Sequence, residues 1–168
     1  MSQNPTSKKT DLKQVPALFK TRGQFLGPVN LDIGGGAGEA GTDYLQREHD
    51  VMNIVYDPFN RSFCENLEDL FIVGRGNADT VTICNVLNVI KERKYRLRVL
   101  RLAKVMCCTE GTIYIQIYEG SKTGKPVETV KGWQLNAPAN HWKYRDDIVS
   151  LFGENSVKLE KNIYTIER

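Results

Sequence analysis

The sequence predicts an α/β protein with a mostly parallel sheet that ends in an antiparallel hairpin. Strand-like apolar runs alternate with helix-like stretches over residues 29–118, a pattern typical of parallel strands joined by helical crossovers. A run of glycines interrupts the chain directly after the first of these strands. Two further strand-like segments near the C-terminus flank Lys161-Asn162, where we expect Asn162 to adopt positive φ in a tight turn.

The size and composition are those of one globular domain. The chain has 168 residues, 40% hydrophobic and 26% charged, with a formal net charge of +3, and no apolar run approaches the roughly 20 residues that span a bilayer. We expect residues 1–11 to form a disordered polar tail and residues 12–168 to form a single domain. Because the N-terminus carries no secretory signal pattern, we expect a cytoplasmic protein without membrane partners.

Metal chemistry is not expected from this sequence. The four cysteines have no CxxC spacing, and the two histidines stand far apart without accompanying thiols or carboxylates at ligand spacing. We therefore interpret the cysteines as core residues and predict no metal site.

The N-terminal half is expected to alternate helices and strands. A short covering helix over 14–25 precedes an apolar strand over 29–33, which ends at Gly34. A helix over 41–47 then leads to a strand over 51–56, which Asp57-Pro58 terminates because proline cannot donate a ladder hydrogen bond.

The third expected helix, over 61–70, should bury one side that carries Phe63, Leu67 and Leu70. The residues that follow it, Phe71-Ile72-Val73, are too few for a full strand. A complete doubly wound sheet has a strand at this point, so we expect that edge strand to be reduced or missing.

The C-terminal half contains the clearest periodic patterns. A buried strand over 81–84 precedes an amphipathic helix over 91–106, and residues 111–118 alternate as a strand. After a long polar connection, a helix over 144–152 ends at Gly153, which suits positive φ beyond a helix end. The terminal hairpin strands are expected at 156–160 and 163–166.

The glycine-rich loop and the acid that follows it predict a nucleoside site. Asp32 lies at the end of the first strand and is followed by Gly34, Gly35, Gly36 and Gly38, so a ligand can approach the backbone amides closely. Asp57 ends the second strand about 20 residues later, at a spacing that suits a carboxylate binding both hydroxyls of a ribose. Parallel strands bring these two ends to the same edge of the sheet.

The pattern Asp32-x-Gly34-x-Gly36-x-Gly38 resembles the first motif of class I S-adenosylmethionine-dependent methyltransferases, and Asp57 resembles their second. The resemblance covers about residues 28–166 and implies their Rossmann-like fold with its antiparallel terminal hairpin. It also implies S-adenosylmethionine as the cofactor. In this family the first acid holds the methionine ammonium through the loop, and the second acid binds the ribose.

The end of the third buried strand adds to the resemblance. It is similar to the segment beside the sulfonium, especially in small phage and bacterial members with an Asn-x-x-Asn there. The cofactor-binding residues implied are Asp32, Gly34, Gly35, Gly36, Gly38, Asp57, Pro58, Phe59, Asn85, Val86 and Leu87. A missing edge strand would remove the family's usual acid near adenine, which leaves Gly76, Asn77 or Asp79 as the adenine contacts to consider.

The acceptor side is expected to include the long connection that follows the strand over 111–118. Asn88, Trp133 and Trp142 are the candidate substrate-binding residues, because long loops at strand ends commonly carry such contacts. Either indole alone can instead belong to the core. If the acceptor loses a proton, Tyr118, Glu119 and His141 are the candidate catalytic residues.

The methyl acceptor stays open between nucleic acid, nucleotide and small molecule. Aromatic residues mixed with lysines in the long connection favour an anionic partner, whereas the DPPY-type signature of amino-methylating DNA enzymes is absent from 85–88. The sequence carries no signal of an oligomeric state.

Two other functions are compatible with parts of the pattern. Gly36-Ala37-Gly38-Glu39-Ala40-Gly41 matches the GxGxxG fingerprint of an NAD-dependent oxidoreductase, but in that register Asp32 has no task. Alternatively, a retained pocket that binds S-adenosylmethionine without catalysis would serve a module acting on a host protein or RNA.

Overall fold

A computed structural model describes residues 12–129 and 132–168; the predicted disordered tail, 1–11, lies outside the described residues. A six-stranded sheet has the order β2-β1-β3-β4-β8-β7, and β5 and β6 form a separate two-stranded sheet. The strands are β1 (Val29–Ile33), β2 (Met52–Tyr56), β3 (Ala78–Cys84), β4 (Cys107–Gln116), β5 (Lys125–Thr129), β6 (Gly132–Asn136), β7 (Val157–Glu160) and β8 (Ile163–Glu167). The helices are α1 (Ala17–Arg22), α2 (Ala40–His49), α3 (Phe63–Val73), α4 (Arg93–Met106) and α5 (Trp142–Phe152).

The predicted sheet topology is confirmed. Strands β2, β1, β3 and β4 pair in parallel, and β8 pairs antiparallel with both β4 and β7. The strand expected to be reduced is missing, because Phe71-Ile72-Val73 forms the last turn of α3 and the chain returns directly to β3 beside β1. Among the described residues, β2 therefore pairs only with β1 and forms one edge of the sheet.

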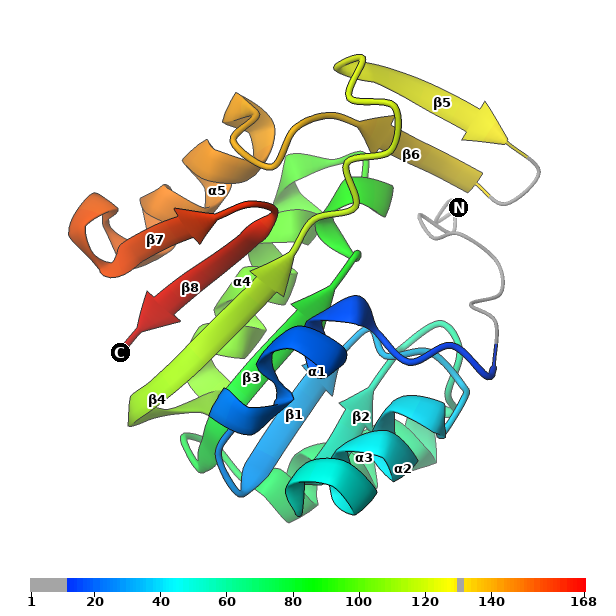
Figure 1. Ribbon diagram of the computed structural model, residues 1–168, viewed down its shortest axis with the longest axis vertical. Coiled ribbons are helices and arrows are strands. Elements are labelled where there is room, and N and C mark those ends of the chain that lie inside the picture. The colour runs from blue at the N-terminus through cyan, green and yellow to red at the C-terminus, as the bar shows by residue number, and fades with distance from the viewer. Residues whose placement is uncertain (1–11, 130–131) are drawn as a thin grey trace.

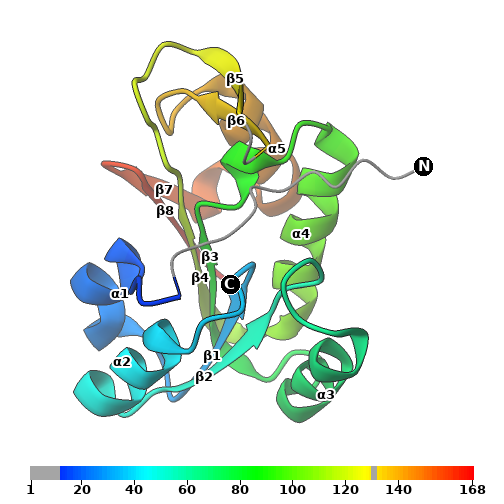
Figure 2. The same ribbon diagram turned by 90° about the vertical axis from the view of Figure 1, so that its right-hand side faces the viewer.

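Helices cover both faces of the sheet. Figure 2 shows α1 and α2 on one face and α3, α4 and α5 on the other. The larger apolar cluster lies beneath α4 and α5 and includes Leu100 and Ile148. A smaller cluster joins Leu18 and Phe19 of α1 to Tyr114 of β4. As a result, residues 113–116 of β4 are buried on both faces.

Two sequence predictions about these elements are wrong. Phe63 and Leu67 were expected to face the core, but both are exposed, because α3 buries the side that carries Asn66 and Val73. In the terminal hairpin Lys161, not Asn162, adopts positive φ. The Asn162 side-chain amide instead donates a hydrogen bond of 2.9 Å to the Ile117 carbonyl of the neighbouring strand.

The connection between β4 and α5 is more regular than expected. It contains the β5–β6 hairpin, which lies above the sheet in Figure 1. Its final part is anchored in the core, since the Tyr144 hydroxyl donates to the Leu135 carbonyl and the Tyr164 hydroxyl donates to the Ala139 carbonyl.

Within the described ranges, no helix combines the length and the apolar character needed to cross a membrane. The cysteines do not all lie in the core as expected, because Cys64 on α3 is exposed.

Candidate functional site

The candidate site lies where the parallel strands β1, β2 and β3 end. The glycine loop follows β1, Asp57 follows β2, and the segment 85–88 follows β3. The Gly36 amide donates a hydrogen bond of 2.9 Å to the Asp57 carboxylate, so the two predicted motifs meet. All three strand ends contribute to one edge of the sheet.

The glycines in the loop are required by backbone conformation and by close packing. Gly34 and Gly36 have φ of 84° and 80°, which residues with a Cβ rarely adopt. The Gly34 amide donates to the Tyr56 carbonyl at 2.7 Å. A Cβ on Gly34 would lie 2.4 Å from a methyl carbon of Val86, so the end of β3 presses directly against this loop.

Two other glycines in the loop are crowded by the protein itself. A Cβ on Gly35 would lie 2.4 Å from the Asp32 carboxylate, and one on Gly38 would lie 2.7 Å from the Leu12 carbonyl. Leu12 also lines, with Asp32, a small cavity of about 20 Å³ beneath the loop. A space of that size holds about one water molecule.

Asp32 is buried in a polar network that crosses the sheet. Its carboxylate accepts a hydrogen bond of 2.8 Å from the Thr82 hydroxyl, which itself accepts one from Asn30. Asn30 also donates to Asn53, and Asn53 donates to Thr42 of α2. Burial raises the pKa of the Asp32 carboxyl to about 7; the Thr82 hydrogen bond lowers it, and the neighbouring Asp57 charge raises it.

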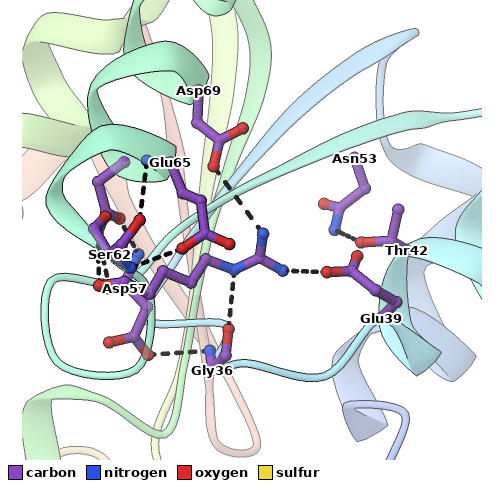
Figure 3. A network of polar contacts seen from close by, with 10 residues as sticks. Gly36, Glu39, Thr42, Asn53, Asp57, Ser62, Glu65 and Asp69 are labelled. Atoms are coloured by element: carbon purple, nitrogen blue, oxygen red, sulfur yellow. Dashed lines mark hydrogen bonds and ion pairs between the residues drawn. The ribbon is translucent and has the colours of Figure 1, made fainter.

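The Asp57 carboxylate accepts hydrogen bonds from several backbone and side-chain donors. In addition to Gly36, its carboxylate accepts hydrogen bonds from the Phe59 amide and from both the backbone and the side chain of Asn60, at 2.9–3.0 Å. The Asp57 amide donates to Asn66 at 2.7 Å, and Asn66 donates back to the Asp57 carbonyl. Figure 3 shows the contact between Gly36 and Asp57.

Arg61 fastens the glycine loop from the other side, a role that the sequence analysis missed. Its Nε donates to the Gly36 carbonyl at 3.1 Å, and its guanidinium pairs with Glu39 beside α2. Only 13% of its side chain is exposed. No local motif marks this role, because the two partners that tie Arg61 to the loop, Gly36 and Glu39, lie more than 20 positions away in the sequence.

The segment after β3 combines an unusual backbone with a buried polar group. Asn85 has φ of 61°, a conformation that costs free energy for a non-glycine residue. Asn88 lies in the 3-10 turn Leu87–Val89, which contacts β6. It is 2% exposed, and its side-chain oxygen has no hydrogen-bond partner in the part of the chain that the structure describes.

Two of the three candidate catalytic residues are already engaged in the fold. Glu119 accepts a hydrogen bond from the Ala139 amide and pairs with Lys122 at 2.7 Å, and the hydrogen bond from Lys122 lowers the pKa of its carboxyl. His141 caps α5 by accepting from the Lys143 amide; burial lowers the pKa of its imidazole, and Lys143 lowers it further. The side chain of Tyr118 is about half exposed.

The two tryptophans have different environments. Trp133 on β6 is partly buried and packs against the main core. Trp142 is 62% exposed, stacks on His141 and has the Lys143 ammonium over its ring. The reading of Trp142 as a core residue is therefore wrong.

The candidate adenine contacts are misplaced. The start of β3 carries Gly76, Asn77 and Asp79, and it lies at the opposite end of the parallel strands from the glycine loop. Asp79 there accepts a hydrogen bond from the amide of Val29, the first residue of β1. By contrast, Pro58 and Phe59 follow Asp57 directly and are exposed at the candidate site. Within the described ranges, no three His, Cys, Asp or Glu side chains are grouped so that they could hold a metal ion.

Comparison with known proteins gives structural likeness without sequence likeness. No protein-family profile matches the chain, and neither does any curated protein sequence. Among solved structures, the fold is similar to that of the 1,6-didemethyltoxoflavin-N1-methyltransferase of Burkholderia thailandensis, solved with S-adenosylhomocysteine bound. The TM-score is 0.56 and the identity 12%, over 91% of this chain and 79% of that one.

Two further solved structures agree with this one. A sugar N-methyltransferase of Streptoalloteichus has a TM-score of 0.54 at 13% identity, covering 100% of this chain and 98% of its own. DesVI of Streptomyces venezuelae has a TM-score of 0.58 at 9% identity, covering 90% of each chain. The expected Rossmann-like methyltransferase fold, with its antiparallel terminal hairpin, is confirmed.

Proposed function

We propose that this chain is an S-adenosylmethionine-dependent methyltransferase that binds its cofactor at the carboxyl ends of β1, β2 and β3. The observation that carries the proposal is the hydrogen bond from Gly36 to Asp57. It joins the glycine loop after β1 to the acid after β2 at the carboxyl ends of these strands. Fold likeness to methyltransferases supports the same activity.

The residues present fit such a cofactor. The glycine loop lets a ligand approach the backbone closely, while the Gly34 and Gly36 amides donate to Tyr56 and Asp57 and fix the shape of the loop. The Asp32 carboxylate beneath the loop provides the negative charge that an α-ammonium group needs.

The Asp57 carboxylate accepts four hydrogen bonds, three from backbone amides and one from the Asn60 side chain. The Asn60 side chain is exposed and is held by its hydrogen bond to Asp57. A ribose hydroxyl can replace that donor and leave the three backbone amides in place.

Phe59 adds an apolar surface next to Asp57. It is 47% exposed although it is aromatic and apolar. An adenine ring bound beyond the ribose would stack on this side chain and remove it from water. Asn85, Val86 and Leu87 complete the cofactor side from β3.

When bound, the cofactor supplies a methyl group on a sulfonium whose departure leaves a neutral thioether. The protein's task is therefore mainly to align the acceptor with that methyl group. We assign this task to Asn88, because its buried side-chain oxygen lacks a partner among the described residues and could accept a hydrogen bond from an acceptor N–H or O–H. Tyr118 and the face of Trp142 would extend the acceptor surface.

A second candidate function is cofactor binding without turnover, in a module that acts on a host protein or RNA. It is favoured by the engagement of Glu119 and His141 in structural hydrogen bonds, which leaves neither free to take a proton in this conformation. Methylation of an already nucleophilic acceptor needs no such base, so turnover is the experiment that separates the two candidates. A cytoplasmic location is part of the proposal.

The first test is calorimetric titration with S-adenosylmethionine, S-adenosylhomocysteine and NAD. We expect dissociation constants in the micromolar range for the first two and no comparable binding of NAD. Preference for NAD would overturn the proposal in favour of an oxidoreductase.

The second test is a transfer screen with methyl-labelled cofactor over nucleic acid, nucleotide, protein and small-molecule pools. Label in one pool, lost in Asp57→Ala, supports the enzyme. Cofactor binding with label in none of the pools supports the non-catalytic module.

A further inference from the structure

Helix α3 has an unusually apolar exposed side. Phe63, Leu67, Phe71 and Ile72 are 79%, 56%, 86% and 65% exposed. The first three follow at i, i+4 and i+8, so they form one stripe along the helix. Contiguous exposed apolar side chains of this size mark an interaction surface on a soluble domain.

The charge on α3 restricts the partner. The helix carries Glu65, Glu68 and Asp69 and no lysine or arginine between Phe63 and Val73. Glu68 forms no ion pair within residues 12–129 and 132–168. Two α3 helices packed on each other would bring these acids together, so the complementary surface must be basic.

Helix α4 of the same chain has that complementary character. Between Arg93 and Met106 it contains six lysines and arginines and no acid. Lys94, Arg98, Arg101 and Val105 lie at i, i+4, i+7 and i+11 and are exposed. The three cations form no ion pair with another described residue; two of them lie over the ring of Tyr95 at 4.8 and 5.2 Å.

The placement of the two helices permits a closed dimer. Both lie on the same face of the sheet (Figure 2), and their lengths of 11 and 14 residues are similar. A two-fold axis between two copies would place α3 of each copy on α4 of the other. Each copy would then use both helices in the same interface, so the assembly would be complete with two chains.

We propose that the chain forms a two-fold homodimer in which α3 of each copy packs against α4 of the other. Guanidinium groups of Arg98 and Arg101 lie over the exposed phenyl rings and pair with the α3 carboxylates, while their aliphatic stems cover Leu67. This interface is independent of the proposed methyl transfer, because it uses the helices of one layer and leaves the glycine loop untouched.

The test is the mass of the full chain in solution, measured by light scattering after gel filtration and by sedimentation across a concentration series. We expect a species of twice the 19.0 kDa chain mass. Phe71→Ser should raise the dimer dissociation constant by roughly 1000-fold, because the two-fold axis removes two interface anchors at about 30-fold each. Arg98→Glu with Arg101→Glu should also yield monomer.

Charge reversal provides the sharper test. Adding Glu68→Lys to the Arg98→Glu, Arg101→Glu chain places a lysine on α3 opposite the new glutamates on α4. Opposite charges then face each other at both symmetry-related contacts, so part of the dimer should be recovered. The matched controls are Phe25→Ser and Arg47→Glu, which change exposed residues on the opposite layer and should leave the mass unchanged. Circular dichroism and melting curves establish that each variant is folded.

A native chain that remains monomeric up to about 100 μM, far above the micromolar level of a stable dimer, overturns the proposal. So does a dimer that persists in the α3 and α4 variants. A monomer that binds a basic amphipathic peptide through Phe71 would also refute the two-fold pairing, and would assign α3 to another protein.

Discussion

The backbone amide of Gly36 donates a hydrogen bond of 2.9 Å to the carboxylate of Asp57 across a sequence separation of 21 residues. The loop after β1 is thereby held by the residue that ends β2. We therefore expect a change at Asp57 to affect cofactor binding both directly and through the shape of the loop.

Asp57→Ala should weaken S-adenosylmethionine binding by about 1.5–3 kcal/mol, because a charged acceptor of hydrogen bonds is lost. The matched variant is Asn60→Ala, which removes the exposed side-chain donor to the same carboxylate. If a ribose hydroxyl takes that place, Asn60→Ala should bind the cofactor at least as tightly as the native chain. Titration calorimetry on both variants decides this; equal losses would show that Asn60 itself supports the ligand.

Arg61→Ala should weaken cofactor binding by about tenfold, since the loop loses its hydrogen bond to the Gly36 carbonyl and the link to Glu39. Arg47→Ala is the control, because Arg47 forms an exposed pair with Glu48 on α2 and such pairs contribute little. Melting temperature and affinity are measured for both. A similar affinity in the two variants would contradict the role of Arg61 in the loop.

The stability of the protein should fall as the pH rises through the range in which Asp32 ionises. Folding raises the pKa of this carboxyl from 3.8 to about 7 by burial, so the native state holds the proton more tightly than the unfolded state does. Stability is then lost progressively between these two pKa values and stays at its lower level above about pH 7. Denaturant unfolding of Asp32→Asn should show a gain over the native chain that grows from about pH 4 to about pH 7 and stays constant above that.

The same ionisation should govern cofactor binding in the opposite sense. The ionised carboxylate favours a ligand ammonium, so affinity for S-adenosylmethionine should rise as the pH passes through about 7 and then level off. Asp32→Asn should bind more weakly and lose this pH dependence. A native chain whose affinity is flat between about pH 6 and about pH 8 would remove Asp32 from the ammonium site.

The two tryptophans should respond differently to truncation. Trp142→Ala should change the free energy of unfolding by less than about 0.5 kcal/mol, because the indole is 62% exposed. Trp133→Ala should cost up to about 3 kcal/mol, since the indole packs against the main core. If Trp142 contacts the acceptor, its variant should lose transfer activity while keeping cofactor affinity; loss of both in parallel with stability would rule out that contact.

The sequence by itself determined the order of the elements, the glycine loop and the acid at the end of β2. These follow from local rules: Gly34 must adopt positive φ where a strand ends, and proline at 58 prevents further strand pairing. The short segment before β3 likewise indicated the missing edge strand. Each of these signals is carried by neighbouring residues and does not depend on what packs against them.

The tertiary structure alone decided the environment of those residues. The raised pKa of Asp32 depends on burial among side chains from β1, β2 and β3, and the anchoring of Gly36 by Arg61 joins residues 25 positions apart. The side of α3 that carries Phe63 and Leu67 faces solvent because the helix packs on the sheet through its other side, although its periodicity is that of a buried helix face. Apolar spacing reveals that a helix has an apolar side, whereas the partner of that side depends on which elements the rest of the chain places beside it.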